Sequence, residues 1–146
     1  MKLFHISSND LNNKIITPKI PDNILTKMGI ENNSIPRISF APEIKYSLLA
    51  IGYNRLKSGP DILNVYEPDN YRSLKIIDSK ELDQKGYVPD AKRTREVWVL
   101  NNVKFKYLGK IKIIKPKKEF VKIDLPGGQS IKNYFWEYKV IDGEFE

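Results

Sequence analysis

The residues best suited to bind a small polar ligand gather at a predicted strand-to-helix corner. Ser39 and Phe40 lie in a short apolar segment, Ile38 to Ala41, and Ser47 follows one turn inside the helix that Pro42 opens. Ser47 falls on the apolar face of this helix, where an unpaired hydroxyl costs roughly 1–3 kcal/mol. The corner is therefore either a small polar pocket in an apolar wall or an ordinary β–α corner whose serines bond the local backbone.

An imidazole and a carboxylate lie elsewhere in the chain. The strand predicted at Lys2–Ile6 presents His5 on the face that points away from the core. Glu96 opens the strand predicted at Glu96–Leu100 and follows the basic loop at residues 92–95. A lone His on a strand is more often a structural hydrogen-bonding residue, and a Glu before an apolar strand is more often solvated. For each residue alone, a functional role and a purely structural or solvated one both stay open.

The elements that must position these residues indicate an α+β domain over residues 1–146, with mainly antiparallel sheet and one main helix. Ile44, Leu48 and Ile51 recur at helical spacing and predict that helix. The other expected elements are strands at Lys2–Ile6, Ile38–Ala41, Ile62–Tyr66, Glu96–Leu100, Val103–Lys115, Phe120–Leu125 and Tyr134–Ile141, and short helices near Asn23–Met28 and at Ser79–Gln84. Pro126-Gly127-Gly128 predicts a hairpin between the last two strands.

Lysines alternate with apolar residues from Val103 to Lys115, and Gly109 in this run predicts a bulge. The lysines of one face are Lys104, Lys106, Lys110 and Lys112, followed by Lys115, Lys117 and Lys118. Such a row is either an electrostatic footprint for a phosphate backbone or the solvated face of an amphipathic sheet.

Composition limits the possible functions. The chain has 146 residues, a formal net charge of +7, no Cys and one His. Disulfides, thiolate metal sites, Cys nucleophiles and multi-histidine sites are excluded, so no metal is expected. With no membrane-spanning run and no signal sequence, we expect a cytoplasmic protein. The positive charge favours an acidic partner. The abundance of Lys, Ile and Asn is also typical of an AT-rich genome, such as that of a phage or a low-GC bacterium.

Taken together, three segments resemble the ADP-ribosyltransferase fold of diphtheria-type toxins and poly(ADP-ribose) polymerases. In that family the first strand carries a His or Arg followed by a small residue, as in Phe4-His5-Ile6-Ser7. The second strand ends in an aromatic and an alanine before a helix with a serine one turn in, as in Ile38-Ser39-Phe40-Ala41 and Ser47. The third motif is a glutamate that opens an apolar strand, as in Glu96-Val97-Trp98-Val99-Leu100. The resemblance covers residues 2–115 and implies a split β architecture.

The resemblance also implies roles for individual residues, with NAD as a substrate. His5 would hydrogen-bond the adenosine ribose with support from Ser7, and Ser39 and Ser47 would line the nicotinamide pocket, with Ser47 bonding the carboxamide. Glu96 would accept a hydrogen bond from the 2′-hydroxyl of the nicotinamide ribose and stabilise the charge that develops on this sugar. The remaining implied contacts are those of NAD with Arg37 and Phe40 and those of an acceptor with Arg93, Thr94 and Arg95.

The chain departs from the family pattern at three positions. Many members have stacking tyrosines where this chain has Ser39 and Ala50, and members that modify arginine or asparagine have Glu or Gln where it has Thr94. Two hypotheses follow. The first is an enzyme that transfers ADP-ribose to an acidic protein or nucleic acid acceptor, in the host cytoplasm if the chain is phage-encoded. The alternative is a non-catalytic protein that binds a nucleotide, a nucleic acid or a partner protein, such as a phage inhibitor of a defence system.

Overall fold

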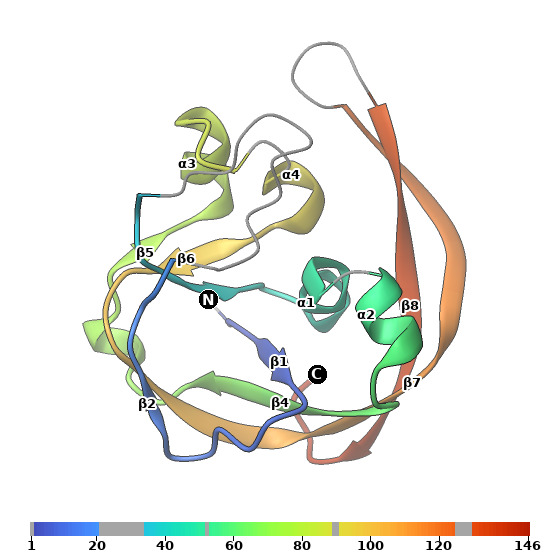
Figure 1. The fold of residues 1–146 in the computed structure, drawn as a ribbon, viewed down its shortest axis with the longest axis horizontal. Coiled ribbons are helices and arrows are strands. Elements are labelled where there is room, and N and C mark those ends of the chain that lie inside the picture. The colour runs from blue at the N-terminus through green and yellow to red at the C-terminus, as the bar shows by residue number, and fades with distance from the viewer. Residues whose placement is uncertain (1, 21–33, 52, 89–90, 125–129) are drawn as a thin grey trace.

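The computed structural model describes residues 2–20, 34–51, 53–88, 91–124 and 130–146 (Figure 1). The strands are β1 (His5–Ser7), β2 (Ile15–Ile16), β3 (Ile38–Phe40), β4 (Ile62–Pro68), β5 (Ile76–Ile77), β6 (Val97–Val99), β7 (Val103–Asp124) and β8 (Ser130–Asp142). The helices are α1 (Ile44–Ile51), α2 (Tyr53–Ser58), α3 (Ser79–Gln84) and α4 (Ala91–Thr94), with a 3-10 turn at Tyr71–Ser73. None of these described helices has the length and apolar character needed to cross a membrane.

The strands form two antiparallel sheets, which confirms the predicted α+β class. The larger sheet has the order β1-β4-β7-β2, with β8 paired to β7, and the smaller sheet has the order β3-β6-β5. In Figure 1, α3 and α4 lie on the side of the smaller sheet, and α1 and α2 lie beside the long β7–β8 hairpin. The pairing of β7 with β8 confirms the predicted hairpin, whose turn lies outside the described residues. The separate strands predicted at Val103–Lys115 and Phe120–Leu125 are wrong, because β7 continues as one strand through both segments.

Most of the predicted elements are present with shifted ends. Helix α1 begins at Ile44, two residues after Pro42, and α3 matches its predicted bounds, with Asp78 capping it by accepting a 2.9 Å bond from the backbone N–H of Glu81. Strand β4 continues through Pro68, which we expected to end it. Strands β2 and β5 and helix α4 were not predicted, because two to four residues show no measurable periodicity. The helix expected near residues 23–28 lies outside the described residues.

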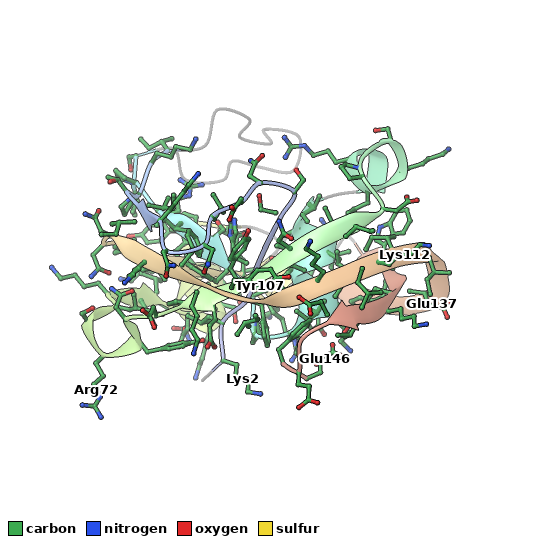
Figure 2. All side chains as sticks on the ribbon, turned by 90° about the horizontal axis from the view of Figure 1, so that it is seen from below. Lys2, Arg72, Tyr107, Lys112, Glu137 and Glu146 are labelled. Atoms are coloured by element: carbon green, nitrogen blue, oxygen red, sulfur yellow. The ribbon has the colours of Figure 1, made fainter. Side chains whose placement is uncertain are left out.

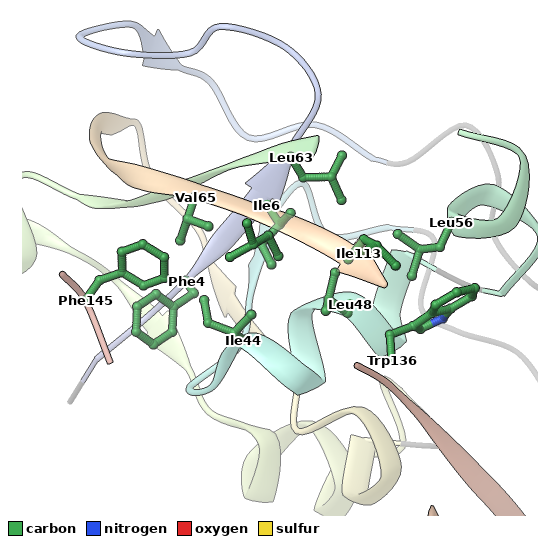
Figure 3. Close-up of a cluster of buried hydrophobic side chains, with 11 residues drawn as sticks. Phe4, Ile6, Ile44, Leu48, Leu56, Leu63, Val65, Ile113, Trp136 and Phe145 are labelled. Carbon is green, nitrogen blue, oxygen red and sulfur yellow. The ribbon is translucent and has the colours of Figure 1, made fainter. Parts of the chain in front are cut away.

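Strand β1 separates two parts of the core. Phe4 and Ile6 point into one cluster with Ile44 and Leu48 of α1, as Figure 3 shows. Leu3, on the opposite face, belongs to a second cluster beneath the smaller sheet. The alternation predicted for this strand is therefore confirmed, and it leaves His5 on the side of the second cluster.

A β-bulge in β7 lies opposite the point where β4 passes from the first core cluster to the second. The register pairs Val65 with Gly109 and Tyr66 with Tyr107, so β7 carries one extra residue at this point. Val65 and Tyr66 are both fully buried, one in each cluster, because the bulge turns the inward face of β4. The bulge predicted at Gly109 is therefore confirmed.

Candidate functional site

The site is built where the two sheets meet and separate. Phe4 and Ala41 exchange backbone hydrogen bonds of 2.8 and 3.0 Å between β1 and the end of β3, and Arg37 exchanges bonds of 3.1 and 3.3 Å with Lys19. Backbone groups of alternate residues point to the same edge of a strand. Ser39 lies midway between Arg37 and Ala41, so its carbonyl points to the edge of β3 that faces β1.

His5 occupies this edge. Its Nδ1 lies 3.1 Å from the carbonyl oxygen of Ser39, and its ring packs against Phe40 and Phe105, with centroids 5.7 and 5.1 Å away. Burial among these rings lowers the pKa of His5 below 6.5, although the bond to Ser39 opposes the shift. A carbonyl can only accept, so Nδ1 carries the proton of the neutral ring and Nε2 is an acceptor. At neutral pH the imidazole is therefore neutral, with Nε2 as its hydrogen-bond acceptor.

Glu96 is hydrogen-bonded to the side chain of Ser39. Ser39 Oγ donates a 2.6 Å hydrogen bond to Glu96 Oε1, and Trp98 Nε1 donates a 3.1 Å bond to the same oxygen. Ser39 and Trp98 are directly opposite each other in the β3–β6 register, and Glu96 is two residues before Trp98, so all three side chains share one face. Bonds to a carboxylate are charge-assisted and are among the strongest in proteins. The carboxylate is therefore fixed at the start of β6.

Ser39 thus joins two of the predicted residues, with its carbonyl on His5 and its hydroxyl on Glu96. These three residues come from three segments that are far apart in the sequence. Trp98 was not among the predicted site residues. The alternation of side chains along Glu96-Val97-Trp98 could have identified it, because residues two apart on a strand share a face.

Ser47 contacts the backbone just before β1. Its hydroxyl is buried and donates a 3.3 Å bond to the carbonyl oxygen of Phe4, which also receives the N–H of Ala41. Ser47 therefore ties α1 to the junction of β1 and β3. Ser7 accepts a 3.1 Å bond from the backbone N–H of Asn9. The predicted ligand contacts of Ser47 and Ser7 stay predictions.

Arg37 and Phe40 are both buried. Phe40 belongs to the second core cluster and supports the His5 ring from one side. The guanidinium carbon of Arg37 lies 4.0 Å from the ring centroid of Trp98, and its Nη1 donates a 3.1 Å bond to the carbonyl of Ile35. Only 3% of the surface of Arg37 is exposed. The structure thus places its charge against Trp98.

The three residues before Glu96 come from α4 and its end. Thr94 is buried, and its Oγ1 lies 3.4 Å from the backbone nitrogen of Glu96, which donates to it. Arg95 is exposed and has a φ of 50°, a strained value for a residue with a side chain. Its guanidinium lies 4.9 Å from the ring centroid of Tyr46 and 4.0 Å from Glu43. Arg93 is half-buried. The predicted acceptor contacts of Arg93, Thr94 and Arg95 stay predictions.

A cavity of about 270 Å³ lies at the start of α1. Its lining comes from the start of the chain, the start of α1, β8 and the final residues: Lys2, Phe4, Pro42, Glu43, Ile44, Lys45, Tyr138, Phe145 and Glu146. It includes neither Ser39 nor Glu96. In the part of the chain that the structure describes, no cluster of three or more His, Asp or Glu residues could hold a metal ion.

The predicted lysine face is present on β7. Lys104 and Lys106 lie 3.9 and 3.8 Å from Asp69 and Glu67. Lys112 is exposed and stands directly opposite Lys139 of β8; Figure 2 shows Lys112 at this end of the sheet. The side chains of Lys115, Lys117 and Lys118 lie outside the described part.

No family model, curated protein or solved structure matches this chain.

Proposed function

We propose that the chain is an ADP-ribosyltransferase-like enzyme that binds NAD beside β1, the corner at residues 37–51 and Glu96, and transfers ADP-ribose to a protein or nucleic acid acceptor. One observation carries the proposal: His5 and Glu96, predicted to act on the same ligand, are both hydrogen-bonded to Ser39. The three residues belong to the three motifs that resemble this family.

The arrangement of the sheets supports the same proposal. The smaller sheet meets the larger one at the bridge between Phe4 and Ala41, and His5 follows immediately on β1. A split β architecture, as the resemblance implies, would bind its ligand where the two sheets diverge.

The reaction would break the bond between the nicotinamide ring and its ribose. The electron pair of that bond leaves with nicotinamide, and positive charge develops on the sugar. The acceptor then donates an electron pair to the same carbon and loses a proton. A fixed carboxylate such as that of Glu96 stabilises the charge, and its pre-organisation avoids reorganisation during the reaction. In this proposal the bonds from Ser39 and Trp98 to Oε1 hold the Glu96 carboxylate in place, and the carboxylate accepts the ribose 2′-hydroxyl.

The remaining site residues take supporting roles in this proposal. His5 Nε2 accepts a hydroxyl of the adenosine ribose. Arg93 and Arg95 place cationic side chains just before the carboxylate, which favours an acidic acceptor. Ser47 keeps α1 against β1 through the carbonyl of Phe4, which shapes the corner beside the nicotinamide.

The exposed lysines of β7 and β8 favour a second candidate, a non-catalytic protein that binds nucleic acid. Lys112 and Lys139 are cross-strand neighbours of like charge, and a phosphate would relieve their repulsion. Two other lysines of this face already have acidic neighbours, Asp69 and Glu67. The first candidate is therefore the stronger one.

Nicotinamide release from NAD separates the two candidates. We expect the wild-type protein to release nicotinamide from NAD. The variant Glu96→Gln should release it roughly 10²–10³-fold more slowly. The dissociation constant for NAD, from calorimetry, should change less than about threefold. Glu144→Gln is the matched control, because Glu144 is exposed near the chain end. Absence of release from the wild type, with salt-sensitive binding to DNA or RNA, would favour the second candidate.

A further inference from the structure

Trp98 has no role in the proposed reaction, yet it contacts the carboxylate directly. Its indole N–H donates to Glu96 Oε1 at 3.1 Å, and its side chain is fully buried. A buried N–H cannot exchange its partner for water, so this bond is obligatory for the folded chain. The hydroxyl of Ser39 reaches the same oxygen from the neighbouring strand. Two donors from two strands therefore fix the position of one carboxylate oxygen.

The indole is itself held by residues outside β6. The guanidinium carbon of Arg37 lies 4.0 Å from its ring centroid, and Tyr87 stacks on it with ring planes 3° apart and centroids separated by 6.2 Å. Arg37 is attached to β3 and Tyr87 follows α3. Leu82 and Val88 complete the cluster around the ring. The direction in which the N–H points is thus set by packing and charge from three parts of the chain.

We propose that Trp98 is the positioning residue of Glu96 and that Arg37 acts through the indole rather than by touching a ligand. The indole N–H and the Ser39 hydroxyl prevent the carboxylate from rotating, so that it faces the sugar when positive charge develops. The kinetic consequence rests on the proposed function, whereas the contact itself can be tested without NAD. Arg37 is only 3% exposed, so its guanidinium lies inside the protein against the indole.

The contact is tested by the indole N–H signals of the chain. The sequence has two tryptophans, so protein labelled with ¹⁵N-tryptophan gives two such signals, and Trp136→Phe identifies the one from Trp98. We expect Glu96→Gln to shift the Trp98 signal and to leave that of Trp136 in place. An unshifted Trp98 signal would overturn the proposal. This measurement needs neither NAD turnover nor a variant of Trp98.

The catalytic consequence is tested by Trp98→Phe, which keeps an aromatic ring beneath Arg37 and removes the N–H. We expect kcat for nicotinamide release to fall about 10–100-fold, the range for losing a hydrogen bond to a charged group. The KM for NAD should change less than about threefold, because the ligand contacts are intact. Trp136→Phe makes the same chemical change in the other core cluster and serves as the control.

The outcomes separate this proposal from the proposed function. A raised KM with unchanged kcat, or equal losses in the two Trp variants, would overturn the positioning role. If the wild type releases no nicotinamide while the Trp98 signal still responds to Glu96→Gln, the proposed function fails and the contact stands. If Trp98→Phe does not fold, Arg37→Met tests the same support, with a loss of kcat expected and an unchanged kcat counting against the proposal.

Discussion

The ring of His5 donates through Nδ1 to the carbonyl oxygen of Ser39, 3.1 Å away and 34 residues along the chain. This bond crosses from the larger sheet to the smaller one and fixes the ring between Phe40 and Phe105. It also assigns the acceptor role to Nε2. The same serine then reaches Glu96 with its hydroxyl, so one residue of β3 organises both sides of the candidate site.

The lowered pKa of His5 predicts a loss of stability in mild acid. The unfolded chain takes up a proton as the pH falls through 6.5, whereas the buried ring takes it up only at lower pH. Between these two values the unfolded state binds more protons, so the free energy of unfolding decreases as the pH falls. Urea unfolding between pH 5.5 and 7.5 measures this slope. The chain has one histidine, so His5→Gln should flatten the slope, and an equal slope in both proteins would contradict the prediction.

Ser39→Ala removes one of the two donors to Glu96 and leaves the backbone carbonyl that receives His5. We expect nicotinamide release to fall about 10–100-fold, since a hydrogen bond to a charged group contributes about 1.5–3 kcal/mol. The KM for NAD, measured in the same assay, should stay at the wild-type value, because the backbone carbonyl of Ser39 still receives the bond from His5. Ser8→Ala, at an exposed bend, is the control. A rate equal to that of the wild type would show that the 2.6 Å bond does not act in the reaction.

Some of this site could be predicted from the sequence, because strand alternation and helix spacing are local. Alternation placed Phe4 and Ile6 in the core and His5 opposite them, and the spacing of Ile44 and Leu48 gave α1. The resemblance of the three motifs then implied that His5, Ser39 and Glu96 belong to one site, and Ser39 does contact the other two. These predictions depend on few residues at a time.

The partners of individual polar groups could not be predicted. Ser47 was expected on a buried helix face, but its acceptor, the carbonyl of Phe4, lies 43 residues away and is chosen by how α1 packs on β1. Trp98 was predicted only as part of the strand Glu96–Leu100. Alternation places Trp98 on the same face as Glu96, but the direction of its N–H also depends on Arg37 and Tyr87, which come from other parts of the chain and pack on the ring.

The bulge at Gly109 predicts a severe effect of added volume. Gly109 has a φ of 157°, and a Cβ there would overlap the backbone carbonyl of Asp142 and meet the ring of Phe145. We expect Gly109→Ala to lower the free energy of unfolding by about 3–5 kcal/mol, which combines backbone strain with overpacking. Gly86→Ala is the control, because Gly86 also has a positive φ but no atom within 4 Å of the added Cβ. Urea unfolding should show a loss of only about 1 kcal/mol there, and similar losses at both positions would refute the steric argument.

The paired lysines of β7 and β8 predict a variant that is more stable than the wild type. Lys112 and Lys139 are directly opposite each other and exposed, and like charges at such positions are destabilising. We therefore expect Lys112→Glu to raise the free energy of unfolding by about 0.2–1 kcal/mol, because it replaces repulsion with attraction. Lys104→Glu makes the same change in net charge but places a carboxylate beside Asp69, now 3.9 Å from the lysine, and should destabilise the protein. Urea unfolding at low and high salt compares the two variants. High salt should reduce both changes in the free energy of unfolding, since they arise between exposed charges.

If the two variants change the free energy of unfolding in the same direction, net charge rather than the cross-strand pair sets the stability of this face.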